Sequence, residues 1–69
     1  MEHYYFIVDD GTAVFNDPFG MLLSDDLKAR QIALKIIAEL KADGSFEDSS
    51  QLIVLRGGKM VVMPFSSIA

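Results

Sequence analysis

The chain has 69 residues, enough for one small domain, and it contains no cysteine, which excludes disulfides and thiolate metal sites. Ten acidic residues against six basic ones give a formal charge of -4, so neither a nucleic acid nor an anionic membrane surface is expected as a partner. Hydrophobic residues make up 51% of the sequence, although a domain of this size has little interior in which to bury them.

The first elements in chain order form a predicted β-hairpin. Residues 3–9 are rich in aromatic and β-branched side chains, which favour a strand. Asp10-Gly11 follows between two apolar stretches, a pattern typical of a hairpin turn, and a second strand is expected over residues 12–15. Residues 16–20 combine Asx residues with proline and glycine and predict another turn. Residues 21–23 are either a short extended return or the lead into a helix.

Residues 25–42 predict a single long helix. Ser24 is expected to be its N-cap, the two aspartates that follow suit the positive end of the helix dipole, and Gly44 is the stop signal. A spacing of about 100° per residue gathers the apolar residues that should face a sheet: Ala29, Ile32, Ala33, Ile36, Ile37 and Leu40. Leu27 and Leu34 lie off this face and widen the apolar arc beyond what one sheet contact needs.

A second β-hairpin is predicted after the helix. Residues 51–56 and 59–65 are expected as strands, and Gly57-Gly58 between them is a two-residue turn that needs positive φ. Pro64 has no backbone N–H, so its end of the strand is expected at a sheet edge or past the last ladder bond. The predicted fold is therefore α+β in the order ββαββ, with two β-hairpins flanking one amphipathic helix that packs on one face of an antiparallel sheet, as a single domain over residues 1–69.

Three of the predicted strands are apolar on both faces. In the first strand Tyr4 and Phe6 point to one side, Tyr5 and Ile7 point to the other, and the last two strands repeat this pattern. One helix covers only one face of a sheet, so the other face is expected to expose an apolar patch of the kind that marks an interaction surface. A homodimer or a larger assembly is therefore predicted, through sheet faces or, as the second geometry, through edge strands. The residues expected at the interface are Tyr5, Ile7, Leu27, Leu34, Ile53, Leu55 and Met63.

No set of residues in the sequence predicts catalysis, a cofactor or a metal ion. His3 is the only histidine, and no nucleophile or orienting partner is identifiable for it. Asp9, Asp10 and Asp17 would suit Mg²⁺ or Ca²⁺ if the first hairpin folded back, but aspartates are expected in turns for backbone reasons alone. Gly57-Gly58-Lys59 resembles part of a phosphate loop, yet a strand follows it in place of a helix. The expectation is no enzymatic activity, no catalytic residue, no cofactor and no metal.

A set of residues at predicted turn, cap and core positions spans nearly the whole chain: Tyr4-Tyr5-Phe6, Asp10-Gly11, Asp17, Gly20, Asp26-Leu27, Ala29-Arg30, Ala33-Leu34, Leu40, Val62 and Pro64-Phe65. Their order resembles a family of short bacterial proteins of unknown function that is abundant in rhizobia and their relatives. The chain departs from the usual pattern at Pro18-Phe19, where such proteins tend to carry acidic residues, and at Ser24-Asp25, where a proline often precedes the aspartate. Because the family has no assigned activity, the resemblance implies no functional residues.

The aromatic first strand, the glycine-containing hairpin and the alanine-rich helix are also similar to the HicB-like antitoxin domain. HicB proteins pair with a small toxin and often carry a DNA-binding segment, which these residues do not include. This resemblance implies a specific protein partner as an alternative function.

Three functions are therefore left open. The first is a non-enzymatic protein-interaction module that acts as a homo-oligomer, and the second is an antitoxin-like binder of one specific protein. The third is a small-ligand carrier or enzyme with a pocket between protomers, for which the sequence offers only His3, Tyr5, Asp9 and Asp10 as polar groups. A cytoplasmic location is expected, because the sequence shows neither a secretory signal nor an apolar run of about 18 residues.

Overall fold

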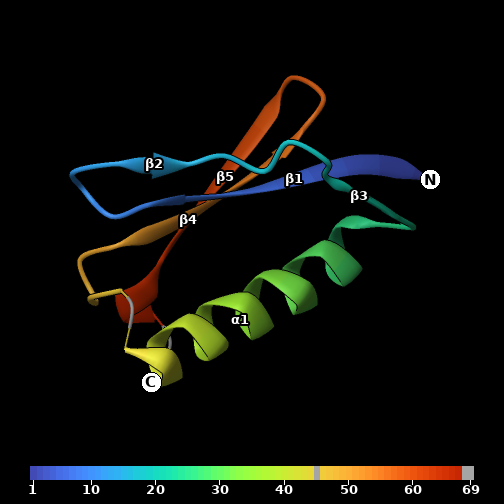
Figure 1. Cartoon of the computed structure of the whole chain (residues 1–69). Helices are drawn as coiled ribbons and strands as arrows, with labels where there is room; N and C mark the ends of the chain where they lie inside the picture. The colour runs from blue at the N-terminus through green and yellow to red at the C-terminus, as the bar shows by residue number, and fades with distance from the viewer. Residues whose placement is uncertain (45, 68–69) are drawn as a thin grey trace.

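The fold consists of one long helix and an open antiparallel sheet, seen in a computed structural model that describes residues 1–44 and 46–67 (Figure 1). In chain order the elements are β1 (Glu2–Asp9), β2 (Val14–Phe15), β3 (Met21–Leu23), α1 (Asp26–Asp43), β4 (Gln51–Arg56), β5 (Lys59–Pro64) and the 3-10 turn η1 (Phe65–Ser67). The predicted α+β class, with one helix packed on an antiparallel sheet, is confirmed. In the described part of the chain, no helix is both long and apolar enough to cross a membrane.

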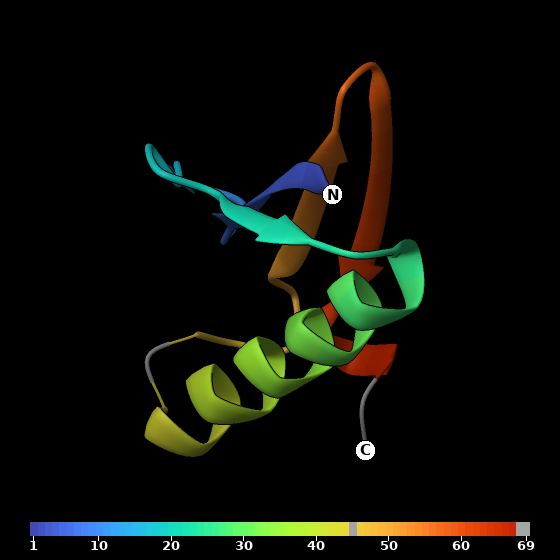
Figure 2. The same cartoon turned by 90° about the vertical axis from the view of Figure 1, so that its right-hand side faces the viewer.

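Strand β1 organises the sheet, whose order is β2-β1-β4-β5. One edge of β1 pairs with β4 over residues 4–9, while its other edge pairs with β3 opposite residues 2–4 and with β2 opposite Val8 and Asp9. The segment that precedes the helix is therefore a strand, β3, and the alternative of a simple lead into the helix is wrong. Strand β5 pairs with β4 and ends the sheet, and helix α1 lies against one face (Figure 2).

The first hairpin has a longer turn and a shorter return strand than the sequence predicts. The Asp10 carboxylate accepts the backbone N–H groups of Thr12 at 2.8 Å and of Ala13 at 2.7 Å. The Asp10 N–H in turn donates to the Ala13 carbonyl at 3.2 Å. These bonds hold residues 12 and 13 in the turn, so that β2 begins at Val14.

Helix α1 begins one residue later than the predicted cap implies. Asp25, and not Ser24, is the N-cap: its backbone is extended, with φ -162° and ψ 174°, and its carboxylate accepts the N–H of Lys28 at 2.8 Å. Both side chains suit this position, and Asp25 takes it because its oxygen reaches the N–H three residues ahead. The predicted stop at Gly44 is confirmed, since this residue has φ 76° and donates its N–H to the Lys41 carbonyl.

The core lies between α1 and the facing side of the sheet. The helix buries Ala29, Ala33 and Ile37, and the two alanines allow a close approach to the strands. The flanking apolar residues of the predicted face, together with Leu34, are half-buried against this core. The buried residues that the sheet and its connections contribute are Tyr4, Phe6, Leu23, Leu52, Val54, Met63 and Phe65.

Met63 lies in this core, contrary to its predicted place at the outer interface. It is 7% exposed and stands opposite Leu52 in the β4–β5 ladder. Directly paired residues of antiparallel strands point to the same face, and Leu52 faces the helix. The two-residue turn at Gly57-Gly58 sets this register by pairing Arg56 with Lys59, so the alternation along β5 is fixed from that pair.

Candidate functional site

The face of the sheet that points away from the helix carries two rows of apolar side chains. Each row runs across β1, β4 and β5, because the paired residues of neighbouring strands share a face. The first row is Tyr5, Leu55 and Met60, and the second row is Ile7, Ile53 and Val62. We call these six residues the outer patch.

The outer patch is in contact with solvent. Met60 is 62% exposed and Val62 is 42% exposed, while the four residues on β1 and β4 are half-buried. In the described part of the chain, helix α1 covers the opposite face of the sheet (Figure 2). A continuous apolar surface of this kind on a small domain is typical of an interaction site.

The aromatic ring of His3 borders the outer patch. It stacks on Tyr5 with ring centroids 4.8 Å apart and an interplanar angle of 8°, and its Nε2 donates to the Phe19 carbonyl at 2.7 Å. Gly20 makes room for the ring, since a Cβ at this position would lie 2.5 Å from two His3 ring atoms. The histidine is therefore held as part of the edge of the patch.

The acidic side chains near the first hairpin are occupied by turn backbone. The pKa of Asp10 is lowered by the Ala13 and Thr12 N–H groups, and that of Asp17 is lowered chiefly by the Gly20 N–H. Asp9 accepts the N–H of the residue two positions ahead at 2.9 Å. Within residues 1–44 and 46–67, no three His, Cys, Asp or Glu side chains gather in a way that could hold a metal ion.

The polar groups that the sequence offers for a ligand or catalytic pocket do not meet within one chain. His3 and Tyr5 lie side by side near the start of β1, whereas Asp9 and Asp10 lie at its other end. At about 3.3 Å per residue, the strand separates the two pairs by roughly 15–20 Å. The chain alone therefore provides no convergent polar site from these residues.

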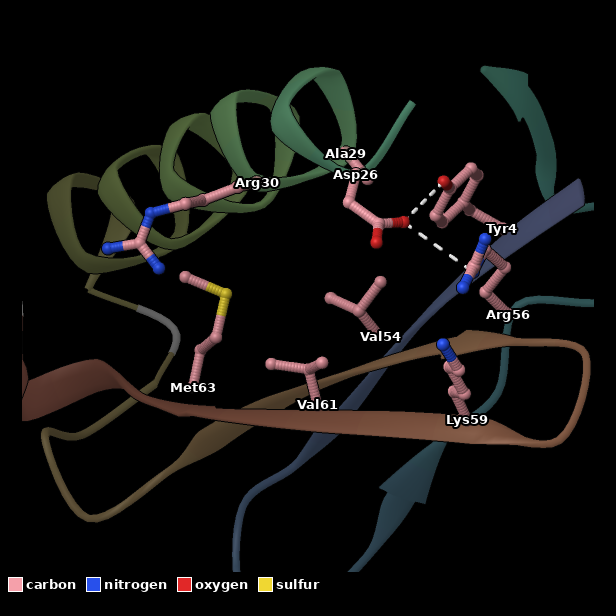
Figure 3. A pocket seen from close by; sticks show the side chains of 9 residues that line it. All are labelled: Tyr4, Asp26, Ala29, Arg30, Val54, Arg56, Lys59, Val61 and Met63. Carbon is pink, nitrogen blue, oxygen red and sulfur yellow. Dashed lines mark hydrogen bonds and ion pairs between the residues drawn. The ribbon is translucent and has the colours of Figure 1, made fainter. Parts of the chain in front are cut away.

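A groove opens on the helix side of the sheet, between the start of α1 and the β4–β5 hairpin (Figure 3). Its volume is about 210 Å³. At one end, the Tyr4 hydroxyl donates to Asp26 Oδ1 at 2.6 Å, and the Arg56 Nε lies 3.5 Å from the same oxygen. The bond to the Asp26 carboxylate is the main reason why the pKa of Tyr4 is raised. The groove is lined by Tyr4, Asp26, Ala29, Arg30, Val54, Arg56, Lys59, Val61 and Met63.

The structure distributes the predicted interface residues over four places. Four of them form the centre of the outer patch: Tyr5, Ile7, Ile53 and Leu55. Leu27 is 65% exposed on the helix, Leu34 packs beside the core, and Met63 lies in the core. Met60 and Val62 were not predicted at the interface, although counting outward from the Gly57-Gly58 turn places both opposite predicted residues of β4. The groove was not predicted either, because its basic residues come from the helix and from the second hairpin.

These features define a small α+β domain with one helix on an open sheet, an apolar outer patch and a groove on the opposite side. The family described as "Domain of unknown function (DUF6894)" matches residues 3–56, and the chain belongs to this family. The match runs from within β1 to the last residue of β4. The expectation of a family without an assigned function is thereby confirmed. Comparison with curated proteins and with solved structures gave no match.

Proposed function

We propose that this protein is a non-enzymatic protein-interaction module that works as a homo-oligomer, with the outer patch as its interface. The observation that carries the proposal is the pair of three-residue apolar rows on the sheet face that α1 leaves uncovered. Fully burying an aliphatic side chain of this size contributes about 1.5–3 kcal/mol. Pairing two outer patches would therefore add stability that a 69-residue chain without disulfides needs.

Packing of sheet faces is favoured over pairing of sheet edges. One edge of the sheet is β5, which begins with a charged residue, Lys59, and ends with Pro64, which cannot donate a backbone hydrogen bond. The other edge consists of β2 and β3, which are only two and three residues long. Short, charged or proline-containing edge strands discourage the addition of another strand. The outer patch has no charged residue among its six members, and a two-fold axis would place the same rows on both protomers.

The test is sedimentation equilibrium at micromolar concentrations, with one substitution made at two sites. Leu55→Lys puts a charge into the first row of the outer patch, and it is expected to convert the assembly into monomers. Leu27→Lys makes the same change on the exposed side of α1 and is expected to leave the assembly intact. A wild-type chain that sediments as a 7.6 kDa monomer, or dissociation by Leu27→Lys alone, would contradict the proposal.

A second variant separates loss of association from loss of folding. Met60 is 62% exposed in the single chain, so Met60→Lys should not disturb the core. We expect it to weaken association while the circular dichroism spectrum stays that of the wild type. The thermal midpoint of the wild type should rise with protein concentration, because association stabilises the folded chain by mass action.

A further inference from the structure

The groove on the helix side of the sheet has an apolar floor between two charged ends. Figure 3 shows Arg30 beside Met63 at one end, Arg56 and Lys59 at the other, and Val54 and Val61 between them. The groove lies on the face opposite to the outer patch, so it stays accessible when two outer patches pair. The inference drawn from it is therefore independent of the proposed function.

The charge of the groove is opposite to that of the whole protein. It gathers three of the six basic residues of a chain whose formal charge is -4. Asp26 is the one acidic residue that lines it, and its carboxylate is already shared by Arg56 and the Tyr4 hydroxyl. Arg30 and Lys59 form no ion pair or hydrogen bond with any residue in the described ranges 1–44 and 46–67. Within these ranges, each end of the groove thus presents one positive charge that no acidic side chain neutralises.

The size of the groove limits its occupant to a small molecule. An apolar cavity of about 150 Å³ accommodates a benzene ring, and sites for drug-sized ligands start at about 300 Å³. The groove, at about 210 Å³, falls between these values and has room for one short alkyl chain or one ring. An extended peptide would need further subsites along β5.

We propose that the groove binds a small dicarboxylic acid whose two carboxylates are joined by an apolar spacer. One carboxylate pairs with Arg30 and the other with Lys59, while the spacer covers Val54 and Val61. Lys59 and Met63 are four residues apart on β5, a rise of about 13 Å, and Arg30 lies beside Met63. Octanedioate is shorter than this distance along β5 from Lys59 to Met63. Its two carboxylates therefore fit between the side chains of Lys59 and Arg30 and can pair with one each.

The test is a titration of the ¹⁵N-labelled full chain, followed by amide chemical shifts, with four probes of equal length. The probes are octanedioate, octanoate, octane-1,8-diol and octane-1,8-diamine. We expect octanedioate to bind with a dissociation constant on the order of millimolar and to shift the amides of Arg30, Val61 and Met63. Octanoate should bind about two- to five-fold more weakly, because it can satisfy only one cation. The diol and the diamine should give no comparable shifts.

Two matched variants test the assignment of the charges. Arg30→Gln should weaken octanedioate binding about two- to five-fold and remove its advantage over octanoate. Lys35→Gln removes the same charge from the exposed side of the same helix, and binding should stay unchanged. Equal effects of the two variants would show a general charge effect and overturn the proposal.

Other occupants would give different results. Equal binding of the diamine and of octanedioate, or shifts confined to the outer patch, would contradict the proposed dianion site. A shift of the Arg30 amide on dilution of the protein alone would show that a second copy fills the groove, because Arg30 lies on α1 and not on a strand of the outer patch. A stronger response to the peptide acetyl-Glu-Val-Val-Glu-amide than to octanedioate would assign the groove to an acidic protein segment. Absence of any shift at 20-fold the concentration expected for half-saturation, roughly tens of millimolar, would also overturn the proposal.

Discussion

The carboxylate of Asp17 accepts the backbone N–H of Phe6 at 3.3 Å and thereby fills a gap in the sheet. On this edge of β1, the partner strands β2 and β3 cover only the two ends, and Phe6 lies between them. The second oxygen of Asp17 accepts the N–H groups of Phe19 and Gly20. One side chain therefore holds both the middle of β1 and the loop that passes beside it.

The first prediction concerns the replacement of Asp17. Asp17→Asn is expected to lower the free energy of unfolding at pH 7 by about 1 kcal/mol, since hydrogen bonds to an ionised acceptor are stronger and solvent reaches this carboxylate. Chemical denaturation of both proteins measures the loss. Glu39→Gln removes the same charge from the exposed side of α1 and should change stability by less than about 0.5 kcal/mol.

The contribution of Asp17 should also depend on pH. Its pKa in the folded protein is lowered, chiefly by the Gly20 N–H, so its stabilisation is present above the unfolded pKa of about 3.9 and is lost as pH falls through the folded pKa. The difference between the wild type and Asp17→Asn should therefore shrink below about pH 4. A difference that stays constant down to pH 2 would show that the charge of Asp17 is not involved.

The second prediction compares alanine at two glycines with positive φ. Gly11 has φ 90° and open space around it, so Gly11→Ala should cost about 1–2 kcal/mol from backbone strain alone. Gly20 has φ 66°, and a Cβ there would also lie 2.8 Å from the Tyr4 carbonyl oxygen and 2.5 Å from the His3 ring. Gly20→Ala should therefore cost at least about 1 kcal/mol more, as measured by urea denaturation. Equal losses would mean that the His3 ring moves aside freely.

The third prediction uses two neighbouring isoleucines of α1. Ile37 is fully buried and Ile36 is half-buried, so Ile37→Ala should cost about 2–5 kcal/mol and Ile36→Ala clearly less. Thermal or chemical unfolding of the two variants measures the difference. A larger loss at residue 36 would show that the helix is rotated about its axis relative to the sheet.

The fourth prediction concerns the hydroxyl of Tyr4 at the end of the groove. The bond to Asp26 raises the pKa of Tyr4 above its ordinary value of 10.0. In the Tyr5→Phe variant Tyr4 is the only tyrosine, so an alkaline absorbance titration follows the ionisation of Tyr4 alone. The midpoint of this titration should lie above pH 10. Asp26→Asn should lower the midpoint, because the phenolate would no longer face a carboxylate. A midpoint that this substitution leaves unchanged would remove Asp26 as the cause.

The fifth prediction is that the protein does not bind nucleic acid. The formal charge is -4, half of the basic residues lie around one small groove, and the part of the chain that the structure describes shows no extended basic surface for a phosphate backbone. Fluorescence anisotropy with single- and double-stranded DNA at low salt should show no submicromolar binding. A tight complex with a steep salt dependence would refute this prediction.

The sequence predicted those parts of the fold that depend on local patterns. The helix, its stop at Gly44 and the two-residue turn at Gly57-Gly58 follow from periodicity and glycine placement, and they appear within a residue or two of the expected positions. The N-cap is Asp25 and not the predicted Ser24, because two good capping residues are adjacent and the sequence pattern does not distinguish them. Strand β2 is shorter than predicted, because the Asp10 carboxylate holds residues 12 and 13 in the turn.

Features that depend on tertiary arrangement were predicted less well. Four outer-patch residues were identified from the alternation of apolar side chains along β1 and β4. On β5 the predicted residue, Met63, faces the helix, and the register places Met60 and Val62 on the outer face instead. The basic groove was not predicted, because Arg30 lies far from Arg56 and Lys59 in the sequence and no periodic pattern connects them. Only the packing of the helix against the hairpin brings these charges together.

The pairing of β1 with β4 has a consequence for the speed of folding. The β4–β5 hairpin and helix α1 are made from neighbouring residues, so each forms by local contacts on a short timescale. Val8, however, meets Leu52 only after the chain between them has closed into one long loop that includes the whole helix. Because closing this loop costs entropy, we expect the docking of β1 to be the slow step of folding. Until β1 docks, the edge of β4 that it will occupy stays unpaired, and we expect the chain to be most prone to aggregation during that interval.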